Sequence, residues 1–229
     1  EPEIKDLTNF LNSAGAKIKW KGRTCLVTGV NSLNEISFSV MADRIETGTF
    51  CVAATIAKGD LEIQNSNPKV IKTELNILKR AGAKIKVLEN KICIKGPKVI
   101  KPIKNLKTKE WPGVATDMQS QIMVLMCVAN GESSIIENIF ENRFLHVGEL
   151  QRLGAKIKIK NNKATIQGNT KFIGAELMSS DLRASVALVL AAMVSRGKSI
   201  INRIYHLDRG YEDIEKKLRR IGVRIKRLK

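Results

Sequence analysis

Three arginines, Arg143, Arg183 and Arg209, lie where strands are predicted to end or a helix to begin, and their chemistry would be anion binding. Arg143 belongs to the loop 137–144 and Arg209 to the loop 202–212. Loops at the carboxyl ends of strands, beside helix N-termini, are where α/β proteins bind anions. A planar guanidinium pairs bidentately with phosphate or carboxylate. These residues predict a site for a small polyanion; the alternative is surface ion pairing, which stabilises little.

Three aspartates, Asp43, Asp117 and Asp181, each precede an apolar helical segment that ends in a glycine 16, 14 and 16 residues later. A carboxylate at a helix start accepts hydrogen bonds from free backbone N–H groups, for about 1 kcal/mol. Capping is a sufficient role for Asp43. Asp117 and Asp181 have polar neighbours that a cap does not require, which makes both candidates for a functional site. These neighbours are Gln119, Gln121, Arg183 and Ser185.

A repeated pentapeptide indicates which elements position these side chains. Gly-Ala-Lys-Ile-Lys occurs at 15–19, 82–86 and 154–158, and the variant Gly-Val-Arg-Ile-Lys occurs at 222–226. Each glycine follows a helical pattern, so we predict that it ends the helix with a positive φ. Alternating apolar and polar residues then predict a strand, and after the first three copies a turn and a second strand complete a hairpin.

The hairpins alternate with the acid-headed helices, each of which is followed by a glycine and a strand. One unit of nearly 70 residues therefore occurs three times, which predicts an α/β fold of pseudo-threefold βαβαββ-like units that is incomplete at both ends. Residues 1–41 hold only a helix and a hairpin, and 224–229 form a single predicted strand that needs a partner. We expect 42–229 to be the three-unit domain, 1–41 to end another domain, and the chain to belong to a longer protein or to need a partner subunit.

The composition restricts the class of protein. The net charge of +18 is compatible with nucleic acid or anionic small molecules, but many lysines alternate along predicted strands, which is typical of a solvated strand face. No apolar run is long enough to span a membrane. The four cysteines, Cys25, Cys51, Cys93 and Cys127, are far apart, so we interpret them as small core residues rather than a zinc or disulfide framework. A reducing cytoplasm fits this pattern.

Five motifs together resemble a known family. The chain is similar to the UDP-N-acetylglucosamine 1-carboxyvinyltransferases, which are enolpyruvyl transferases, over essentially all its residues and in order. The resemblance implies the C-terminal half of an enzyme of two domains, each an inside-out α/β barrel of three units. The motifs are DRIETGT (43–49), WPGVATDMQSQ (111–121), IFENRFLHV (139–147), SDLRAS (180–185) and RIYHLDRGYE (203–212).

The resemblance also implies a reaction, in which the enolpyruvyl group of phosphoenolpyruvate passes to the 3-hydroxyl of UDP-N-acetylglucosamine and phosphate is released. This is the first committed step of peptidoglycan precursor synthesis. By resemblance, Asp117 contacts the hydroxyl and is the candidate base, because a sugar hydroxyl is a poor nucleophile until a carboxylate takes its proton. Asp181 resembles a second proton-handling acid near the methylene carbon of phosphoenolpyruvate. No metal or cofactor is implied.

The remaining site residues are implied in the same way. Arg183 and Arg209 resemble anion contacts for phosphoenolpyruvate, Arg143 a hinge-side or substrate-ordering residue, and Ile139 the position whose backbone touches the sugar nucleotide. At the crossing between the two domains, the resemblance places Asp43 and Arg44.

The family's reactive cysteine, and most of its uridine contacts, belong to the half that this chain does not match. We therefore expect the chain to be inactive alone and to need the N-terminal half, in the same chain or as a separate one. Two alternatives are a transferase like 5-enolpyruvylshikimate-3-phosphate synthase, against which the motifs at 141–144 and 203–212 argue, and a basic non-catalytic protein that binds a partner or nucleic acid. The latter has no RNA-binding signature and few aromatic residues for stacking.

Overall fold

The computed structural model describes residues 1–228, and the chain divides into two compact units, Glu1–Asp43 and Arg44–Lys229. The first unit contains a helix, α1 (Pro2–Ser13), followed by an antiparallel hairpin of β1 (Lys17–Lys21) and β2 (Thr24–Thr28). Asn12 joins the two parts, because its side chain accepts a hydrogen bond from the backbone N–H of Ile18 and donates one to its carbonyl.

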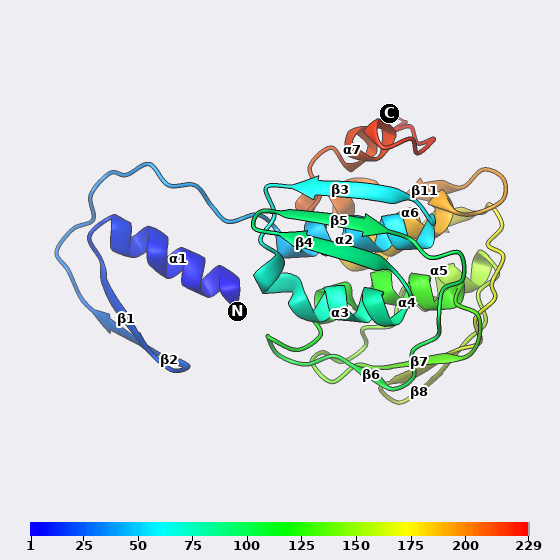
Figure 1. The fold of residues 1–229 in the computed structure, drawn as a ribbon, viewed down its shortest axis with the longest axis horizontal. Helices are drawn as coiled ribbons and strands as arrows, with labels where there is room; N and C mark the ends of the chain where they lie inside the picture. The colour runs from blue at the N-terminus through cyan, green and yellow to red at the C-terminus, as the bar shows by residue number, and fades with distance from the viewer. Residues whose placement is uncertain (229) are drawn as a thin grey trace. The chain divides into compact units, whose positions relative to one another are not determined.

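The second unit consists of three successive modules (Figure 1). The first module contains α2 (Arg44–Ile56), β3 (Asp60–Gln64), the 3-10 helix η1 (Pro68–Ile71), α3 (Lys72–Arg80), β4 (Lys84–Leu88) and β5 (Lys91–Lys95). The second contains β6 (Leu106–Lys107), the 3-10 helix η2 (Thr116–Met118), α4 (Gln119–Cys127), β7 (Ser133–Ile136), α5 (Val147–Arg152), β8 (Ile157–Lys160) and β9 (Lys163–Ile166). The third contains β10 (Glu176–Met178), α6 (Leu182–Met193), β11 (Ile200–Asn202), the 3-10 helix η3 (Ile204–Arg209) and α7 (Ile214–Arg220).

Each module forms its own sheet, and the middle one is the most complete. Its strand order is β6-β7-β9-β8, with β6 parallel to β7 and the other neighbours antiparallel. The first module has the order β3-β5-β4, and the third pairs β10 with β11 in parallel. Parallel neighbours need a crossover, which α4 and α6 supply. Within the described residues, the predicted βαβαββ unit is therefore complete only in the middle module.

The core lies around α2, α4 and α6, which are buried on nearly all sides. Every residue of α4 is buried, as are most residues of α2 and α6. A helix that is apolar all round belongs in an interior. The helix α4 packs against α2 and α6, and the sheets β3-β5-β4 and β6-β7-β9-β8 lie on different sides of the helices (Figure 1). The helices thus lie inside and the sheets outside.

The three central helices run in the same direction. At their C-terminal ends, Ile56, Val128 and Val194 line one hollow of about 440 Å³. In their N-terminal halves, the Ser120 hydroxyl donates to the carbonyl oxygen of Arg183 at 3.0 Å, and the amide of Gln121 lies 3.2 Å from the hydroxyl of Thr49 in the second turn of α2. Three positive helix-dipole ends therefore converge on one side of the unit, where an anion is favoured.

The repeated glycines end their helices as predicted. Gly15, Gly82, Gly154 and Gly222 have φ values of 101°, 108°, 98° and 95°. The N–H of each also donates to a carbonyl three residues earlier, at 2.9 to 3.0 Å. This left-handed conformation is inexpensive only for glycine, which explains why the same residue recurs in each copy.

Three expectations differ in detail from the structure. The predicted strand at 224–229 is not formed over 224–228, since a strand needs a neighbour for its N–H and C=O groups; Lys229 lies outside the described residues. Cys51 and Cys127 are buried as predicted, but Cys25 is exposed and Cys93 only half-buried. Cys25 lies on β2, whose residues are all exposed.

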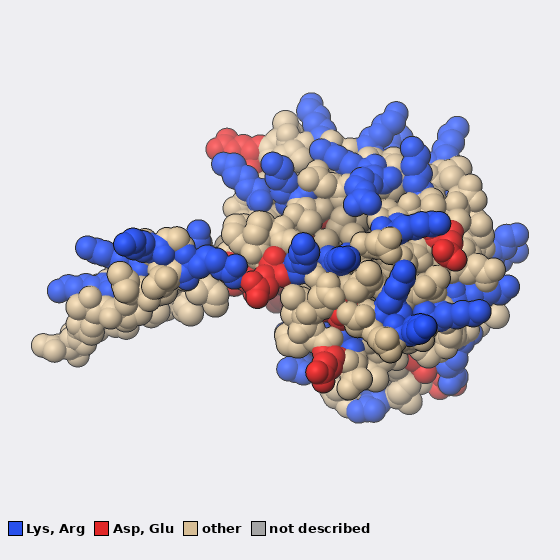
Figure 2. All heavy atoms as spheres, turned by 90° about the horizontal axis from the view of Figure 1, so that it is seen from below, with Lys and Arg blue, Asp and Glu red and all other residues tan. Residues whose placement is uncertain are grey.

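On the face seen in Figure 2, Lys and Arg side chains are spread over both units rather than gathered in one patch, with many uncharged residues and few Asp and Glu among them. On β4 and β8 the lysines at 84, 86, 158 and 160 are exposed, as expected for the solvated faces of strands.

Candidate functional site

Asp117 stands at the solvent end of a buried helix. It lies in η2, the single turn that precedes α4, between the half-buried Thr116 and the buried Met118. The side chain of Asp117 is 35% exposed, whereas the helix behind it is wholly buried. The backbone is therefore fixed by the core while the carboxylate remains accessible.

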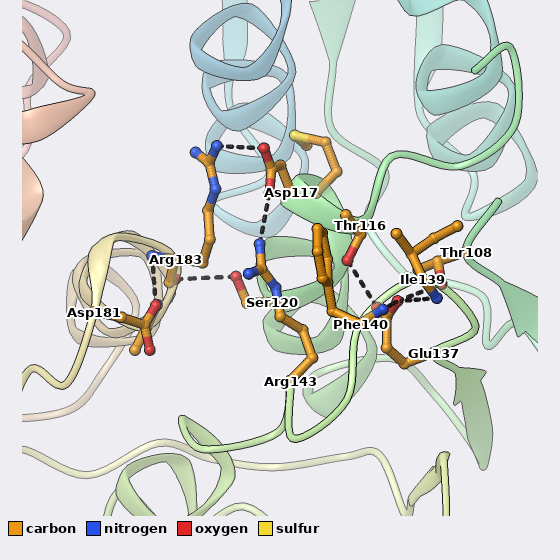
Figure 3. A network of polar contacts seen from close by, with 12 residues as sticks. Thr108, Thr116, Asp117, Ser120, Glu137, Ile139, Phe140, Arg143, Asp181 and Arg183 are labelled. Carbon is orange, nitrogen blue, oxygen red and sulfur yellow. Dashed lines mark hydrogen bonds and ion pairs between the residues drawn. The ribbon is translucent and has the colours of Figure 1, made fainter. Parts of the chain in front are cut away.

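Two guanidinium groups hold this carboxylate. Arg143 Nη2 donates to Oδ1 of Asp117 at 2.5 Å, and Arg183 Nη2 donates to Oδ2 at 2.5 Å (Figure 3). Arg143 comes from the loop after β7 and Arg183 from the first turn of α6, so the second and third modules meet here. The cluster has one positive charge in excess, and it lies at the converging helix N-termini. It can therefore attract an anion that competes with Asp117 for the arginines.

The loop that carries Arg143 adds an aromatic contact. The guanidinium carbon of Arg143 lies 5.2 Å from the centre of the Phe140 ring, within the range of a cation–π interaction. Ile139 is 37% exposed, and its backbone N–H donates to Oε1 of Glu137 at 2.9 Å. Because this N–H already donates to Glu137, the carbonyl oxygen is the backbone group of Ile139 that can contact a ligand.

Asp181 caps α6, which is the alternative role that the sequence left open. Its Oδ1 accepts from the backbone N–H groups of Arg183 and Ala184 at 2.8 and 2.9 Å, and Oδ2 accepts from the Ser180 hydroxyl at 3.0 Å. Burial alone would raise the pKa of Asp181, but the bonds from Ala184, Ser180 and Arg183 outweigh it and leave the pKa below its usual value. This carboxylate is thus an acceptor rather than a donor of protons near neutral pH.

His146 is a buried imidazole next to this cluster. It is 3% exposed, and its Nε2 has no hydrogen-bond partner among the described residues. Burial lowers the pKa of His146 to about 4; the negative charge of Asp181 opposes this shift and the positive charge of Arg143 adds to it. His146 is therefore neutral at pH 7.

Arg209 is exposed, and no contact joins it to Asp117 in the described structure. Its turn nevertheless lies beside α6, since a Cβ added to Gly210 would come within 3.0 Å of Leu182. Asp43 and Arg44 lie where the division between the two units falls, and Arg44 begins α2. The structure thus joins Asp117, Arg143 and Arg183 directly, with Asp181 at the helix end that carries Arg183.

No group of side chains suited to a metal ion is found among the described residues, and no helix among them is long and apolar enough to cross a membrane.

The family model for EPSP synthase (3-phosphoshikimate 1-carboxyvinyltransferase) matches residues 1–218. The chain belongs to this EPSP synthase family. Relatives named UDP-N-acetylglucosamine 1-carboxyvinyltransferase are 59% identical in Pelagibacter ubique and 50% identical in Desulfosudis oleivorans, each over 229 residues. Each alignment covers 100% of this chain and 55% of the relative. The chain spans about half the length of the relatives it matches, and the resemblance drawn from its motifs is confirmed.

Solved structures confirm the predicted fold class of the EPSP synthase family. The enolpyruvyl transferase NikO from Streptomyces tendae superposes with a TM-score of 0.87 at 26% identity, covering 99% of this chain and 54% of that one. EPSP synthase from Acinetobacter baumannii superposes with a TM-score of 0.74 at 18% identity, covering 96% of this chain and 54% of that one.

In this EPSP synthase family member, sequence reasoning missed a buried carboxylate that fixes the segment before Asp117. Glu74 of α3 is 4% exposed and accepts from the backbone N–H of Ala115 at 3.1 Å. Close by, the hydroxyl of Thr73 donates to the carbonyl of Pro112 at 2.6 Å. Glutamate in the first turn of an amphipathic helix is typical of dipole stabilisation, so no sequence signal distinguished Glu74.

A buried junction of hydroxyl and amide groups was also missed. The hydroxyls of Thr49 and Tyr211 lie 2.9 Å apart, and the amide of Gln121 donates to both, at 3.2 and 3.4 Å. The single hydrogen of the Ser120 hydroxyl is shared between the Gln121 oxygen at 2.8 Å and the Arg183 carbonyl oxygen at 3.0 Å. All three modules thereby meet near the helix N-termini. The polar residues after Asp117 were noted as unusual, but their partners lie 72 and 90 residues away.

Proposed function

We propose that the complete protein, of which this chain forms part, transfers the enolpyruvyl group of phosphoenolpyruvate to the 3-hydroxyl of UDP-N-acetylglucosamine. The relatives that share 46–59% identity with the chain carry the name of this activity. The observation that supports it most directly is the carboxylate of Asp117 between Arg143 and Arg183, at the converging N-termini of three buried helices. Such a site offers a proton acceptor beside a preorganised anion site, as the reaction requires.

In this proposal the aspartates accept protons, and the arginines bind the substrate anion. The sugar oxygen forms a bond to the substituted carbon of phosphoenolpyruvate while Asp117 takes the hydroxyl proton, and the methylene carbon gains a proton from the solvent. Loss of a proton from that carbon then expels phosphate with the electron pair of its C–O bond. The lowered pKa of Asp181 keeps it ionised near neutral pH, as the acceptor of this proton must be, and among the described residues its Oδ2 accepts only the Ser180 hydroxyl.

Each oxygen of Asp117 accepts from one guanidinium group, and in our proposal substrate binding exchanges one of these contacts. Phosphoenolpyruvate carries a phosphate and a carboxylate, which are the groups that guanidinium binds best. In our proposal Arg183 turns from Asp117 to this substrate and Arg209 joins it, while Arg143 orders the site and the Ile139 carbonyl contacts the sugar nucleotide. Binding of one substrate thus frees the base for the other.

The chain supplies only part of this site. We propose that 42–229 is one domain, that 1–41 belongs to the other, with Asp43 and Arg44 at the crossing, and that the remaining half comes from the same or a separate chain. Because the chain carries only part of the proposed site, we expect the chain alone to be inactive. A cytoplasmic location is also proposed, since the cysteines in the described part of the chain are free thiols, as a reducing compartment favours.

Two other functions have weaker support. The family model is named for 3-phosphoshikimate 1-carboxyvinyltransferase, but two matching EPSP synthase structures from Acinetobacter baumannii are 18% identical to this chain, far below the relatives named for the UDP-sugar. A nucleic-acid-binding function rests on the charge of +18 alone. The cations are spread out on the face seen in Figure 2 rather than aligned along a groove.

The test uses a completed protein, defined as this chain combined with the part of the Pelagibacter ubique relative that it does not cover. We expect phosphate release that requires both UDP-N-acetylglucosamine and phosphoenolpyruvate. Asp117→Asn should lower kcat at least about 10²-fold by removing the base, whereas Asp60→Asn, on the exposed edge of β3, should not. Release with shikimate 3-phosphate instead of the UDP-sugar, or equal activity of both variants, would contradict the proposal.

A further inference from the structure

Glu137 is a buried carboxylate with four hydrogen-bond donors around it. It follows β7 and is 3% exposed. Its Oε1 accepts from the Thr108 hydroxyl at 2.8 Å and from the backbone N–H groups of Ile139 and Phe140 at 2.9 and 3.3 Å. Its Oε2 accepts from the Thr116 hydroxyl at 3.0 Å (Figure 3).

These donors come from the two segments that carry the ion pair of the site. Thr116 directly precedes Asp117, so Oε2 of Glu137 is bound to the turn that presents the proposed base. Phe140 begins the loop to Arg143 and also lies against its guanidinium. One carboxyl group therefore fixes both sides of the contact between Asp117 and Arg143.

The remaining contacts show that Glu137 is held by directed bonds alone. Thr108, just after β6, is fully buried, and its hydroxyl also accepts from the backbone N–H of Asn138. No cation pairs with Glu137 in the described structure. A buried carboxylate without a cation needs several good hydrogen bonds to offset its desolvation. Because each bond has a preferred length and direction, the group defines a geometry rather than merely filling space.

We propose that Glu137 is a positioning residue for the transfer reaction, acting through Thr116 on Asp117 and through Ile139 and Phe140 on the loop that carries Arg143. Its carboxylate keeps the two segments at one separation while the arginines exchange Asp117 for a substrate anion. This inference rests on the proposed function, because it assigns Glu137 to the same site.

The sharpest test is Thr116→Val in the completed protein. Valine keeps the shape of threonine but removes the hydroxyl, so only the bond between Glu137 and the turn of Asp117 is lost. We expect kcat to fall about tenfold because a displaced base loses its alignment with the hydroxyl, with KM for both substrates within about twofold. Thr116→Ser restores the hydroxyl and should restore kcat. A purely structural role would lower Tm and leave kcat unchanged.

A second pair of variants separates geometry from charge. In Glu137→Gln, the amide oxygen can keep the three donors at Oε1 while its NH₂ donates to the Thr116 hydroxyl, so kcat should stay within about threefold. Glu137→Leu removes every bond. In the chain alone, it should speed hydrogen exchange of the Ile139 and Phe140 amides at least about tenfold, and Glu137→Gln should not.

The outcomes distinguish the two proposals. If the unaltered completed protein releases no phosphate, the proposed function is wrong and the role of Glu137 falls with it. If that protein is active and Thr116→Val keeps its kcat, or Glu137→Leu leaves the amide exchange unchanged, the positioning role alone is overturned. Loss of kcat in Thr116→Val with recovery in Thr116→Ser establishes it.

Discussion

At the scale of single residues, the buried imidazole of His146 makes the stability of the fold depend on pH. Its pKa is about 4 in the folded state and about 6.5 when it is exposed by unfolding. The unfolded chain therefore binds a proton below pH 6.5 that the folded chain excludes until pH 4. The contribution of neutral His146 to the free energy of unfolding is complete above pH 6.5. It decreases by about 3 kcal/mol as the pH falls to 4.

The measurement is urea unfolding of the chain at several pH values between 7 and 4, compared with His146→Gln, which has no titrating group there. The free energy of unfolding of the unaltered chain should fall by about 3 kcal/mol more than that of the variant. The lowered pKa of Asp181 places its own loss of stability below this window. Parallel curves for the two proteins would show that His146 is not the cause.

The sequence indicated which residue types matter here, but not which of them touch. Asp43, Asp117 and Asp181 hold equivalent places ahead of apolar helices, yet Asp181 caps its helix while Asp117 pairs with two arginines. Arg183 is 66 residues from Asp117 in the chain, and this spacing has no periodic signature. The role of Glu137 could not be predicted either, because a lone glutamate after a strand is usually a solvated residue.

At the scale of elements, close approaches of backbone explain why certain glycines cannot be replaced. Gly168 has a φ of 78°, and an added Cβ would lie 2.2 Å from the carbonyl oxygen of Gly131, beside the end of α4. Neither backbone can move without disturbing the hairpin β8–β9 or its neighbour. We expect Gly168→Ala to lower the free energy of unfolding by about 3 kcal/mol or more.

Two control variants divide this cost into its parts. Gly222 has a φ of 95° with nothing within 4 Å of an added Cβ, so Gly222→Ala should cost only the conformational part, about 1 kcal/mol. Gly59 has open space and no positive φ, so Gly59→Ala should be neutral within about 0.5 kcal/mol. Equal costs for all three in urea unfolding would contradict the steric explanation.

Elements were the most predictable level because their signals are local. Periodicity and terminal glycines located α2, α3, α4 and α6 and the three hairpins. The strands β6 and β10 were not predicted individually, since two or three residues carry no period. The strand expected at 224–229 is not formed over the described residues 224–228 for the opposite reason: its alternating pattern is present, but pairing depends on a neighbour that no local pattern supplies.

At the scale of the whole molecule, the distribution of the core predicts how the two units contribute to stability. Both hydrophobic clusters consist of residues between Ile45 and Ile225, so they belong entirely to the second unit. In the first unit, α1 buries only Pro2 and Thr8, β1 buries one residue and β2 none. A piece of about 40 residues with so small a core is at the limit of independent folding.

We therefore expect a chain of residues 44–229 to unfold cooperatively, with a Tm within about 3 °C of the full chain, because burial of apolar area supplies most of the stability. Residues 1–43 alone should show no cooperative transition. Calorimetry of residues 44–229, residues 1–43 and the full chain measures the thermal transition of each, and the Tm of the full chain is the reference. A loss of more than about 10 °C on removing 1–43 would mean that the first unit stabilises the second, and that the helix N-termini around Asp117 depend on it even before the rest of the protein is supplied.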